Sequence, residues 1–247
     1  MQAIAQAALT AIFIIGASSI AFSANVTVTD ADTLVLDGVI YRLQGIVAPE
    51  TDQICLRADG SVWSCGIEAR DKVRDFLGTG AVKCEAIGFD TKYRNRRIGR
   101  CTVDGTDLNE WIVKQGWAID AGPYARGKFK PAEAEAKAAG KGLWKGCFAS
   151  PQSWRYSERR DAALFGNACK ANDSEDRERL FPRNPAMPDG CSIKGRNALR
   201  ARITGHVGIY YMEACRSYGS LKKIDRWFCT EQEAQAEGYR KAFSCRN

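Results

Sequence analysis

The 247-residue sequence has one histidine, His206, and no pair of cysteines at C-x-x-C spacing. Structural zinc sites usually present paired Cys or His ligands at short spacing, so zinc binding is a poor explanation for the ten cysteines. The single histidine also argues against hydrolysis that uses a histidine base. After residue 20, the sequence contains no apolar run long enough to cross a bilayer.

Charged side chains are missing from the first 23 residues. An apolar run from Ala7 to Ile20 is followed by Ala21-Phe22-Ser23, which places small residues at positions −3 and −1 of a cleavage site. This pattern predicts a signal peptide over residues 1–23, removed after Ser23. An uncleaved membrane anchor is the alternative, but the run is short for a span. We therefore expect a periplasmic or secreted protein that has no membrane attachment after cleavage.

An even number of cysteines in an exported chain favours disulfides. Cys55 and Cys65 flank a short loop, Cys84 and Cys101 fall in neighbouring predicted strands, and a Cys147–Cys169 pair would tie the following segment to the preceding domain. We expect these three pairs. The remaining four cysteines allow three connectivities, which the sequence leaves open; they are Cys191, Cys215, Cys229 and Cys245.

Positive charge is concentrated at the C-terminal end. Residues 191–247 hold 11 Lys/Arg against 5 Asp/Glu, which gives +6 of the chain's formal net charge of +7. Such a surface suits a polyanionic partner, although an ordinary solvated basic surface explains it equally well.

Residues 24–150 are expected to form one domain. Asp37-Gly38 and Asp104-Gly105 are hairpin signals, and apolar residues at i, i+4, i+7 and i+8 predict a helix from Gly66 to Leu77. The expected strands cover 25–29, 34–36, 39–43, 82–86 and 97–103, and further helices cover 108–115 and a segment from Pro131 to Gly140 or Gly142. This order is similar to a five-stranded OB-fold β-barrel with packed helices, in the α+β class, although periodicity alone does not exclude other small α+β folds.

The rest of the chain divides into two parts. Residues 151–190 are expected to be a connector, because residues 172–179 are densely charged and three prolines that follow interrupt regular structure. Residues 191–247, here called the tail module, are expected to be a small disulfide-rich α+β unit. Its expected strands are 208–211 and 226–229, and Thr230 with Glu233 forms a capping box that opens a helix reaching about Phe243.

Three short stretches in the first domain combine acids and arginines. They are Asp30-Ala31-Asp32-Thr33, Arg42-Leu43-Gln44-Gly45-Ile46-Val47-Ala48-Pro49-Glu50 and Tyr93-Arg94-Asn95-Arg96. Arginine forks bind phosphate oxygens in a bidentate way. A carboxylate can accept the proton of an attacking water, and a hard cation held by oxygen ligands stabilises developing negative charge. These residue types therefore suit the hydrolysis of a phosphodiester.

The same stretches resemble the staphylococcal nuclease (thermonuclease) family, whose pattern is D-G-D-T, then R-L-x-G-I-D-A-P-E, then a Y-G-R turn. The resemblance spans residues 25–155. It implies an OB-fold nuclease that hydrolyses DNA or RNA with Ca²⁺. Glu50 would be the general base, and Arg42 and Arg96 would clamp the phosphate.

The resemblance also suggests residues for metal and nucleic-acid binding. Asp32 would bind the metal directly, and Ala48 would offer its backbone carbonyl. Asp30 would lie just beyond these direct ligands of the metal. Tyr124 and Phe129 would line the nucleotide groove. Arg94 departs from the family pattern and would add positive charge where the nucleic acid passes.

Two departures from the family pattern concern the metal site. Val47 occupies the position of a second metal-binding aspartate, so we expect Ca²⁺ binding to be weak or absent. Ala31 replaces a turn glycine and restricts the backbone beside Asp32.

The tail module resembles a small C-terminal unit called the sunset domain, which is found appended to nuclease-like domains. That unit usually reads I-Y-H where this chain has Ile209-Tyr210-Tyr211.

Two functions follow from the sequence. The first is an exported metal-dependent nuclease. The alternative is a non-catalytic protein that binds nucleic acid or another polyanion, such as an acidic exopolysaccharide, on the same fold. The sequence leaves the oligomeric state open.

Overall fold

The computed structural model describes residues 25–91, 93, 95–155, 162–170, 173–181, 187–198, 206 and 208–245. The predicted signal peptide and Arg94 therefore lie outside the described residues. No helix among the described residues is both long and apolar enough to span a membrane.

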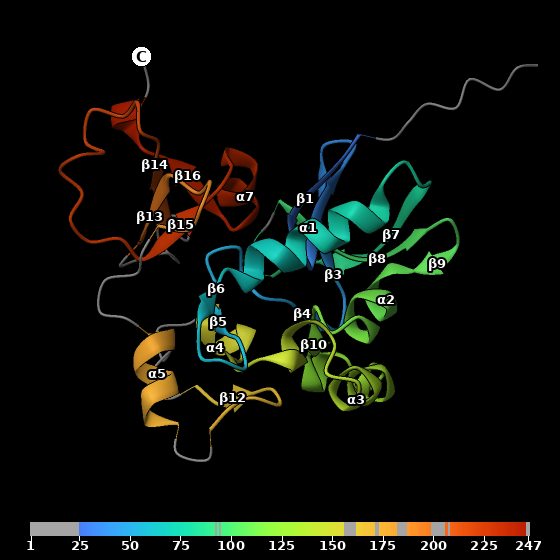
Figure 1. Ribbon diagram of the computed structural model, residues 1–247. Coiled ribbons are helices and arrows are strands. Elements are labelled where there is room, and N and C mark those ends of the chain that lie inside the picture. Colours follow the sequence, from blue (N-terminus) through green and yellow to red (C-terminus); the bar gives the residue numbers. More distant parts are fainter. Residues whose placement is uncertain are drawn as a thin grey trace, which may run out of the picture.

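The first part of the chain is an OB-like barrel domain (Figure 1). Its main sheet has the order β1-β2-β3-β8-β7, in which only the β3–β8 pair is parallel. This is the one-two-three-five-four order that the OB-type prediction requires. The strands are β1 (Val26–Asp30), β2 (Thr33–Leu36), β3 (Val39–Leu43), β7 (Val82–Phe89) and β8 (Arg96–Val103), with β9 (Thr106–Asp107) added beside β8.

Both predicted hairpin turns are present. Asp37 and Gly38 have φ values of 49° and 81°, and Asp104 and Gly105 have 49° and 83°. Two successive positive φ angles are characteristic of the type I′ turn, whose twist matches that of the flanking strands. Ala31 is not among the described non-glycine residues with positive φ, so the turn beside Asp32 does not need the missing glycine.

Helices and short strands complete the barrel domain. The predicted helices correspond to α1 (Cys65–Leu77), α2 (Leu108–Lys114) and α3 (Lys130–Ala138). The apolar stripe of α1 is buried in the barrel core, where Ala69, Val73 and Leu77 join a large hydrophobic cluster. The smaller elements are β4 (Ile46–Val47), β5 (Cys55–Leu56), β6 (Val62–Trp63), β10 (Ile119–Asp120), η1 (Gly122–Tyr124), η2 (Gly142–Lys145) and β11 (Phe148–Ala149).

The segment expected to be a connector contains regular structure. Its elements are α4 (Pro151–Arg155), β12 (Leu164–Phe165), which pairs with β11, and α5 (Ser174–Leu180). The charged run was expected to lie in an irregular stretch, yet α5 forms within it, because Leu180 is buried in a small cluster with Trp154 and Phe181.

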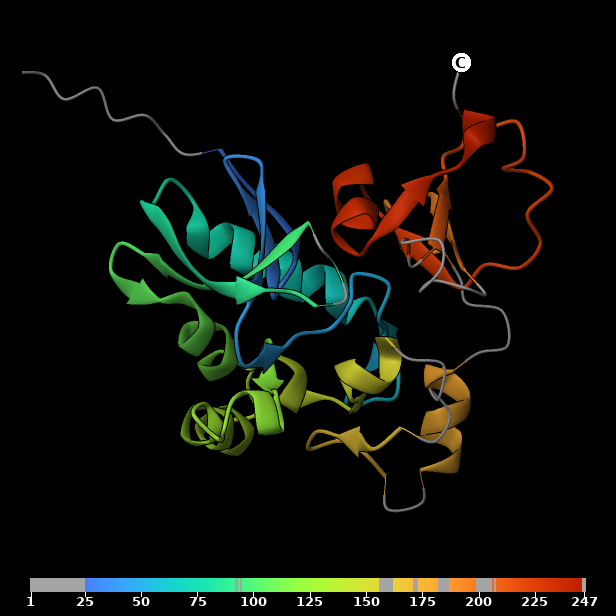
Figure 2. The same ribbon diagram turned by 180° about the vertical axis from the view of Figure 1, so that it is seen from behind.

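The tail module is a four-stranded sheet with one helix packed on it (Figure 2). Its order is β15-β13-β14-β16, where the strands are β13 (Ile193–Asn197), β14 (Gly208–Tyr211), β15 (Arg226–Phe228) and β16 (Tyr239–Lys241). The helix α7 (Glu231–Ala236) starts at the predicted capping residue Thr230, and η4 (Phe243–Cys245) ends the described chain. The prediction that this helix reaches Phe243 is wrong. Gly238, at φ 79°, ends it, and the chain continues as β16, parallel to β14.

All ten cysteines form disulfides. The three expected pairs, Cys55–Cys65, Cys84–Cys101 and Cys147–Cys169, are present. The two pairs that the sequence left open are Cys191–Cys229 and Cys215–Cys245. Five disulfides fit a protein that folds outside the reducing cytoplasm.

Helix α1 also positions the loop that carries Glu50. A Cβ atom added to Gly66 would lie 1.7 Å from the carbonyl oxygen of Glu50, so glycine is required for this close approach. The amide of Gln53 donates to the same carbonyl, at 2.8 Å, and the Gln53 side chain donates to the carbonyl of Ala149. The loop is therefore held between α1 and β11.

We predict that Gly66→Ala destabilises the fold by about 1–3 kcal/mol, because the new methyl group must push α1 away from the Glu50 loop. Urea unfolding followed by circular dichroism measures this change. Gly88→Ala is the matched control, since nothing lies within 4 Å of a Cβ added there. Equal unfolding midpoints for the two variants would contradict the close packing of α1 on this loop.

Candidate functional site

The acidic and basic residues singled out in the sequence lie on one side of the barrel. Asp30 and Asp32 flank the β1–β2 turn, and Glu50 belongs to the loop after β4. Arg42 pairs with Ile98 across the parallel β3–β8 ladder, and Arg96 pairs with Ile40. Residues two apart on a strand share a face, so Arg42 and Arg96 are diagonal neighbours on the same face of the sheet.

Asp32 is fully engaged by protein groups. Its Oδ1 atom accepts hydrogen bonds from Nη1 of Arg42 and from the Thr33 hydroxyl, and its Oδ2 atom accepts the amide of Ala48 at 2.6 Å. Ala48 thus meets Asp32 through its N–H, whereas the sequence-based hypothesis concerned its carbonyl. Asp32 and Arg42 form a buried ion pair that connects the β1–β2 turn to β3.

Asp30 and Glu50 belong to a second group of buried acids. One carboxylate oxygen from each of Asp30, Glu50 and Glu237 lies within 4.8 Å of the others. Oδ1 of Asp30 accepts the amide and the hydroxyl of Thr51, at 3.0 and 2.9 Å, while its Oδ2 has no hydrogen-bond partner. These three oxygens are close enough together to hold a metal ion.

Arg96, in β8 of the barrel, contacts residues of both the barrel and the tail module. Its Nε and Nη2 atoms donate to Oδ2 of Asp90 at 3.0 and 2.7 Å, and its Nη1 lies 3.5 Å from Oε1 of Glu237. The guanidinium also covers the ring of Tyr93, at 4.2 Å from the centroid. The side chain is thereby fixed, with one edge toward the tail module.

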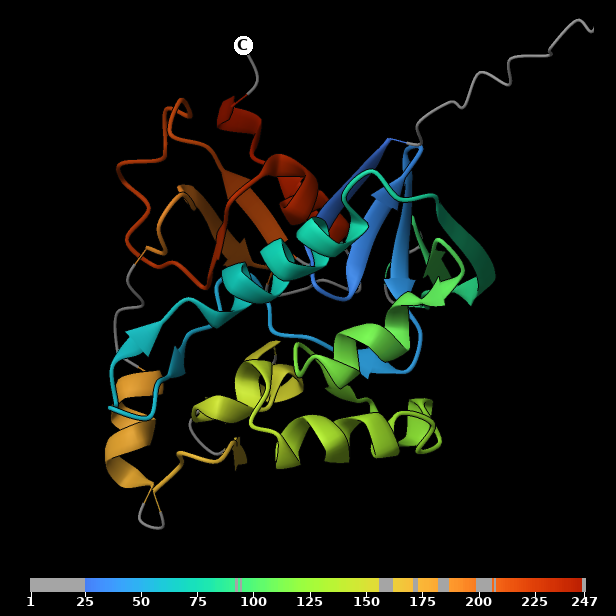
Figure 3. The ribbon, with the colours of Figure 1, turned by 45° about the vertical axis from the view of Figure 1, so that its right-hand side comes forward.

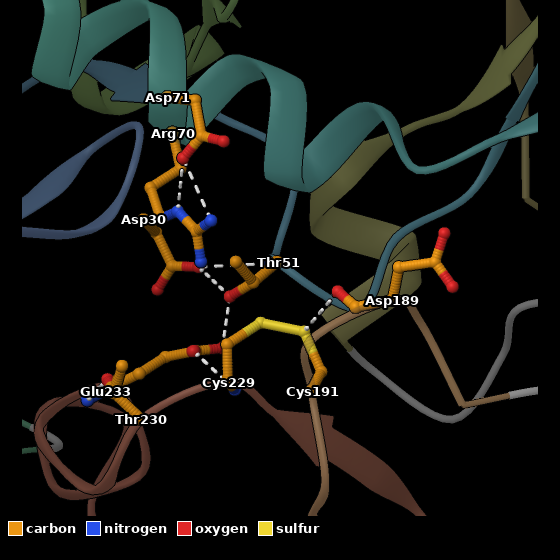
Figure 4. The surroundings of a disulfide bond; sticks show 9 residues. All are labelled: Asp30, Thr51, Arg70, Asp71, Asp189, Cys191, Cys229, Thr230 and Glu233. Atoms are coloured by element: carbon orange, nitrogen blue, oxygen red, sulfur yellow. Dashed lines mark hydrogen bonds and ion pairs between the residues drawn. A yellow bond between two sulfur atoms is a disulfide. The ribbon is translucent and has the colours of Figure 1, made fainter.

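The tail module lies directly over this group of residues. Helix α7 contacts β1, as Figure 3 shows. Arg226 of β15 donates to Oδ2 of Asp52 at 2.8 Å and to Oε2 of Glu50 at 3.1 Å. The Thr51 hydroxyl lies between Asp30 of the barrel and Glu233 of α7 and hydrogen-bonds to both (Figure 4). We call Glu50, Thr51, Asp52 and Arg96 together with Arg226, Glu233 and Glu237 the docking interface.

The docking interface is closed to solvent. Glu50 is 0% exposed, Arg96 is 2% exposed and Arg226 is 4% exposed. Asp52 is further fixed by the indole N–H of Trp154, which donates to its Oδ1 at 3.0 Å. A ligand that approaches from bulk solvent meets the tail module before it meets Glu50 or Arg96.

Burial changes the pKa values of several groups in this region. Burial, followed by the charges of Glu50 and Glu237, raises the pKa of Asp30 well above its usual value. Burial raises the pKa of Glu233 to about 7, although hydrogen bonds from Thr51 and from the Cys229 amide act in the opposite direction. Burial alone would lower the pKa of Arg226, but the carboxylates of Asp52 and Glu50 raise it well above the usual value. Arg226 therefore stays charged at the centre of the interface.

Two residues expected to contact nucleic acid lie in different environments. Tyr124 is 80% exposed on η1, so it remains available to a ligand. Phe129 is 3% exposed and belongs to the barrel core, where its ring packs against Gly45. The hypothesis that Phe129 lines a groove does not match this position, because the chain before α3 turns the ring inward.

Among the seven residues of the docking interface, the sequence analysis assigns a site role only to Glu50 and Arg96. Thr51 and Asp52 directly follow the Glu50 motif, so their neighbourhood was a usable signal. Glu233 is predicted only as the capping-box partner of Thr230. Its amide does donate to the Thr230 hydroxyl at 3.1 Å, so Thr230 caps α7, while the Glu233 carboxylate accepts the Cys229 amide. No motif or spacing indicates that Arg226 and Glu237 contact the barrel.

Comparison with known proteins agrees with the barrel geometry. Residues 41–146 match the family described as staphylococcal nuclease homologue. The succinoglycan biosynthesis protein ExoI of Rhizobium meliloti (strain 1021) is 34% identical over 121 residues, which are 48% of this chain and 62% of ExoI. The chain thus spans less than two thirds of the length of this relative. Residues 41–146 of this chain are therefore similar to the staphylococcal nuclease homologue family, in agreement with the OB-like order of the barrel strands.

Proposed function

We propose that this chain is a periplasmic or secreted nuclease that hydrolyses phosphodiester bonds of DNA or RNA. The observation that carries the proposal is the placement of Glu50 beside Asp30 in one buried group, next to a sheet face that presents Arg42 and Arg96. A base, an anion-binding pair and acidic oxygens in one region are the groups that phosphodiester hydrolysis needs.

Each residue has a separate role in this proposal. Glu50 accepts the proton of the water that attacks phosphorus. Arg42 and Arg96 bind the non-bridging phosphate oxygens and stabilise the charge that builds up as the P–O bond to the leaving group breaks. Tyr124 and Arg94 contact the flanking nucleotides. Arg94 lies outside the described residues, and its role follows from the sequence alone.

The donor set available to Ca²⁺ differs from the one expected. Both oxygens of Asp32 are occupied by Arg42, Thr33 and the Ala48 amide, and Val47 offers no carboxylate. Asp30 does fit a hard cation, because its Oδ2 is buried without a hydrogen-bond partner and lies near carboxylate oxygens. We therefore assign the cation to Asp30, beside Glu50, where it would supply positive charge for the substrate phosphate.

One prediction of the proposed nuclease function concerns Glu50, the general base. Glu50→Gln should lower kcat/KM for single-stranded DNA by about 100-fold or more, because a neutral amide cannot accept the proton. Cleavage is measured with the mature chain in Ca²⁺, with Mn²⁺ as a substitute. Glu110→Gln, on the exposed face of α2, is the matched control and should behave as the wild type. Equal rates for wild type and Glu50→Gln would remove Glu50 from the mechanism.

Another prediction of the proposed nuclease function concerns the carboxylate that is missing at Val47. Val47→Asp should bind Ca²⁺ at least about tenfold more tightly than Val47→Asn in calorimetry, because aspartate adds a charged ligand in the same volume. Its metal-dependent cleavage should rise in parallel. Equal Ca²⁺ affinity for the two variants would show that residue 47 does not face the cation.

The second candidate function is non-catalytic binding of a polyanion such as an acidic exopolysaccharide. Two observations favour it: Asp32 is engaged within the protein, and the related ExoI is described as a succinoglycan biosynthesis protein. In this case, an acidic polysaccharide should bind with an affinity that falls steeply with salt, and single-stranded DNA should stay uncleaved in Ca²⁺. Negligible binding at low salt would exclude this function.

A further inference from the structure

The contact between the tail module and the barrel consists of charged and polar groups. Arg226 meets Glu50 and Asp52, Glu233 meets Thr51, and Glu237 meets Arg96. Each of these tail residues is at most 4% exposed. The contact therefore excludes water, although its specific bonds are ionic or polar.

The tail module has its own hydrophobic core. Ile193, Tyr210, Phe228, Ala234 and Tyr239 form a cluster that, among the described residues, shares no member with the clusters of the barrel and of the connector. Two disulfides, Cys191–Cys229 and Cys215–Cys245, lie within the module. The module therefore has a core and disulfides of its own, which allow it to leave the barrel while it stays folded.

The tail module opposes the charges of the proposed site. The Glu237 carboxylate lies beside Arg96, which would bind a phosphate, and the Arg226 guanidinium lies on Glu50, which would bind the proton of water. A substrate phosphate and Glu237 cannot both occupy the same edge of Arg96. Binding of nucleic acid and docking of the tail module are therefore mutually exclusive.

The balance of charge makes the docked state depend on one arginine. The buried carboxylates of the region are Asp30, Asp32, Glu50, Asp52, Glu233 and Glu237, whereas its buried guanidiniums are Arg42, Arg96 and Arg226. Three cations face six acids, and only Arg226 comes from the tail module. Removal of this charge takes away the guanidinium that pairs with both Glu50 and Asp52 in a buried site, which disfavours docking.

We infer that the tail module is a built-in inhibitor that excludes nucleic acid from the barrel through the ion pairs of Arg226 and Glu237. Release of these ion pairs opens the site while the module keeps its own fold. This inference rests on the proposed function, since it concerns access to the same site. An anionic ligand opens the interface by competing for the arginines that hold it together.

The test compares two variants that each lose one positive charge from the tail sheet. Arg226→Gln breaks the docking interface, whereas Lys194→Gln removes a cation that lies inside the module, on the carbonyl of Tyr218. Affinity for a fluorescent single-stranded oligonucleotide is measured by anisotropy in EDTA, so that no cleavage occurs. We expect Arg226→Gln to bind at least about tenfold more tightly than the wild type, a gain of about 1.4 kcal/mol.

The control should change in the opposite direction. Lys194→Gln should bind the oligonucleotide slightly more weakly than the wild type, because loss of a cation reduces attraction to a polyanion. Arg226→Lys, which keeps the charge, should stay close to the wild type. If Arg226→Gln binds the oligonucleotide no more tightly than Lys194→Gln does, the tail module does not exclude nucleic acid and the inference is wrong.

Hydrogen exchange on the wild-type chain provides a second test, which needs no substitution and so does not depend on whether a variant folds. Saturating oligonucleotide should speed exchange in the α7 segment and leave the β14 amides protected, since the module undocks as a folded unit. Unchanged exchange in α7 when the oligonucleotide is bound would overturn the inference.

Cleavage assays with Ca²⁺ separate this inference from the proposed function. Tighter binding by Arg226→Gln without any cleavage would support the inhibitory role of the tail module and contradict the nuclease function. Equal and efficient cleavage by the wild type and Arg226→Gln would support the nuclease function and contradict the inhibitory role.

Discussion

One ion pair joins parts of the chain that are 176 residues apart, and the arrangement of the site depends on it. Arg226 donates to Glu50 and to Asp52, which lie two residues apart in one loop of the barrel. Buried carboxylates are stable only when they are paired or hydrogen-bonded. The Arg226 guanidinium therefore allows the tail module to cover the loop that carries Glu50 and Asp52. The same contact occupies the carboxylate that we assign as the catalytic base.

The two modules differ in what holds each together and what holds them to one another. Apolar clusters and disulfides stabilise the barrel and the tail module separately. Charged and hydrogen-bonded groups form the specific contacts between them. Interfaces of this kind respond to salt and to competing ions. The inhibitor role that we infer for the tail module therefore relies on contacts that a polyanionic ligand can displace.

Local features were predictable from the sequence, and long-range contacts were not. The Asp37-Gly38 turn, the apolar stripe of α1 and the cap at Thr230 depend on neighbouring residues, and each lies where predicted. The predicted end of α7 is wrong because Gly238, at φ 79°, stops the helix after Ala236. The docking of Arg226 on Glu50 depends on how two separately folded modules meet, which periodicity and spacing do not encode. The inward position of Phe129 likewise depends on packing against Gly45.

A double-mutant cycle on Glu50 and Arg226 tests the central claim most directly. The free energy of unfolding is measured for the wild type, Glu50→Gln, Arg226→Gln and the double variant. Our account predicts a coupling energy of about 1–3 kcal/mol, because each side chain neutralises the other in a buried site. Effects that add to within about 0.5 kcal/mol would show that the two residues do not meet, and would contradict the docked arrangement.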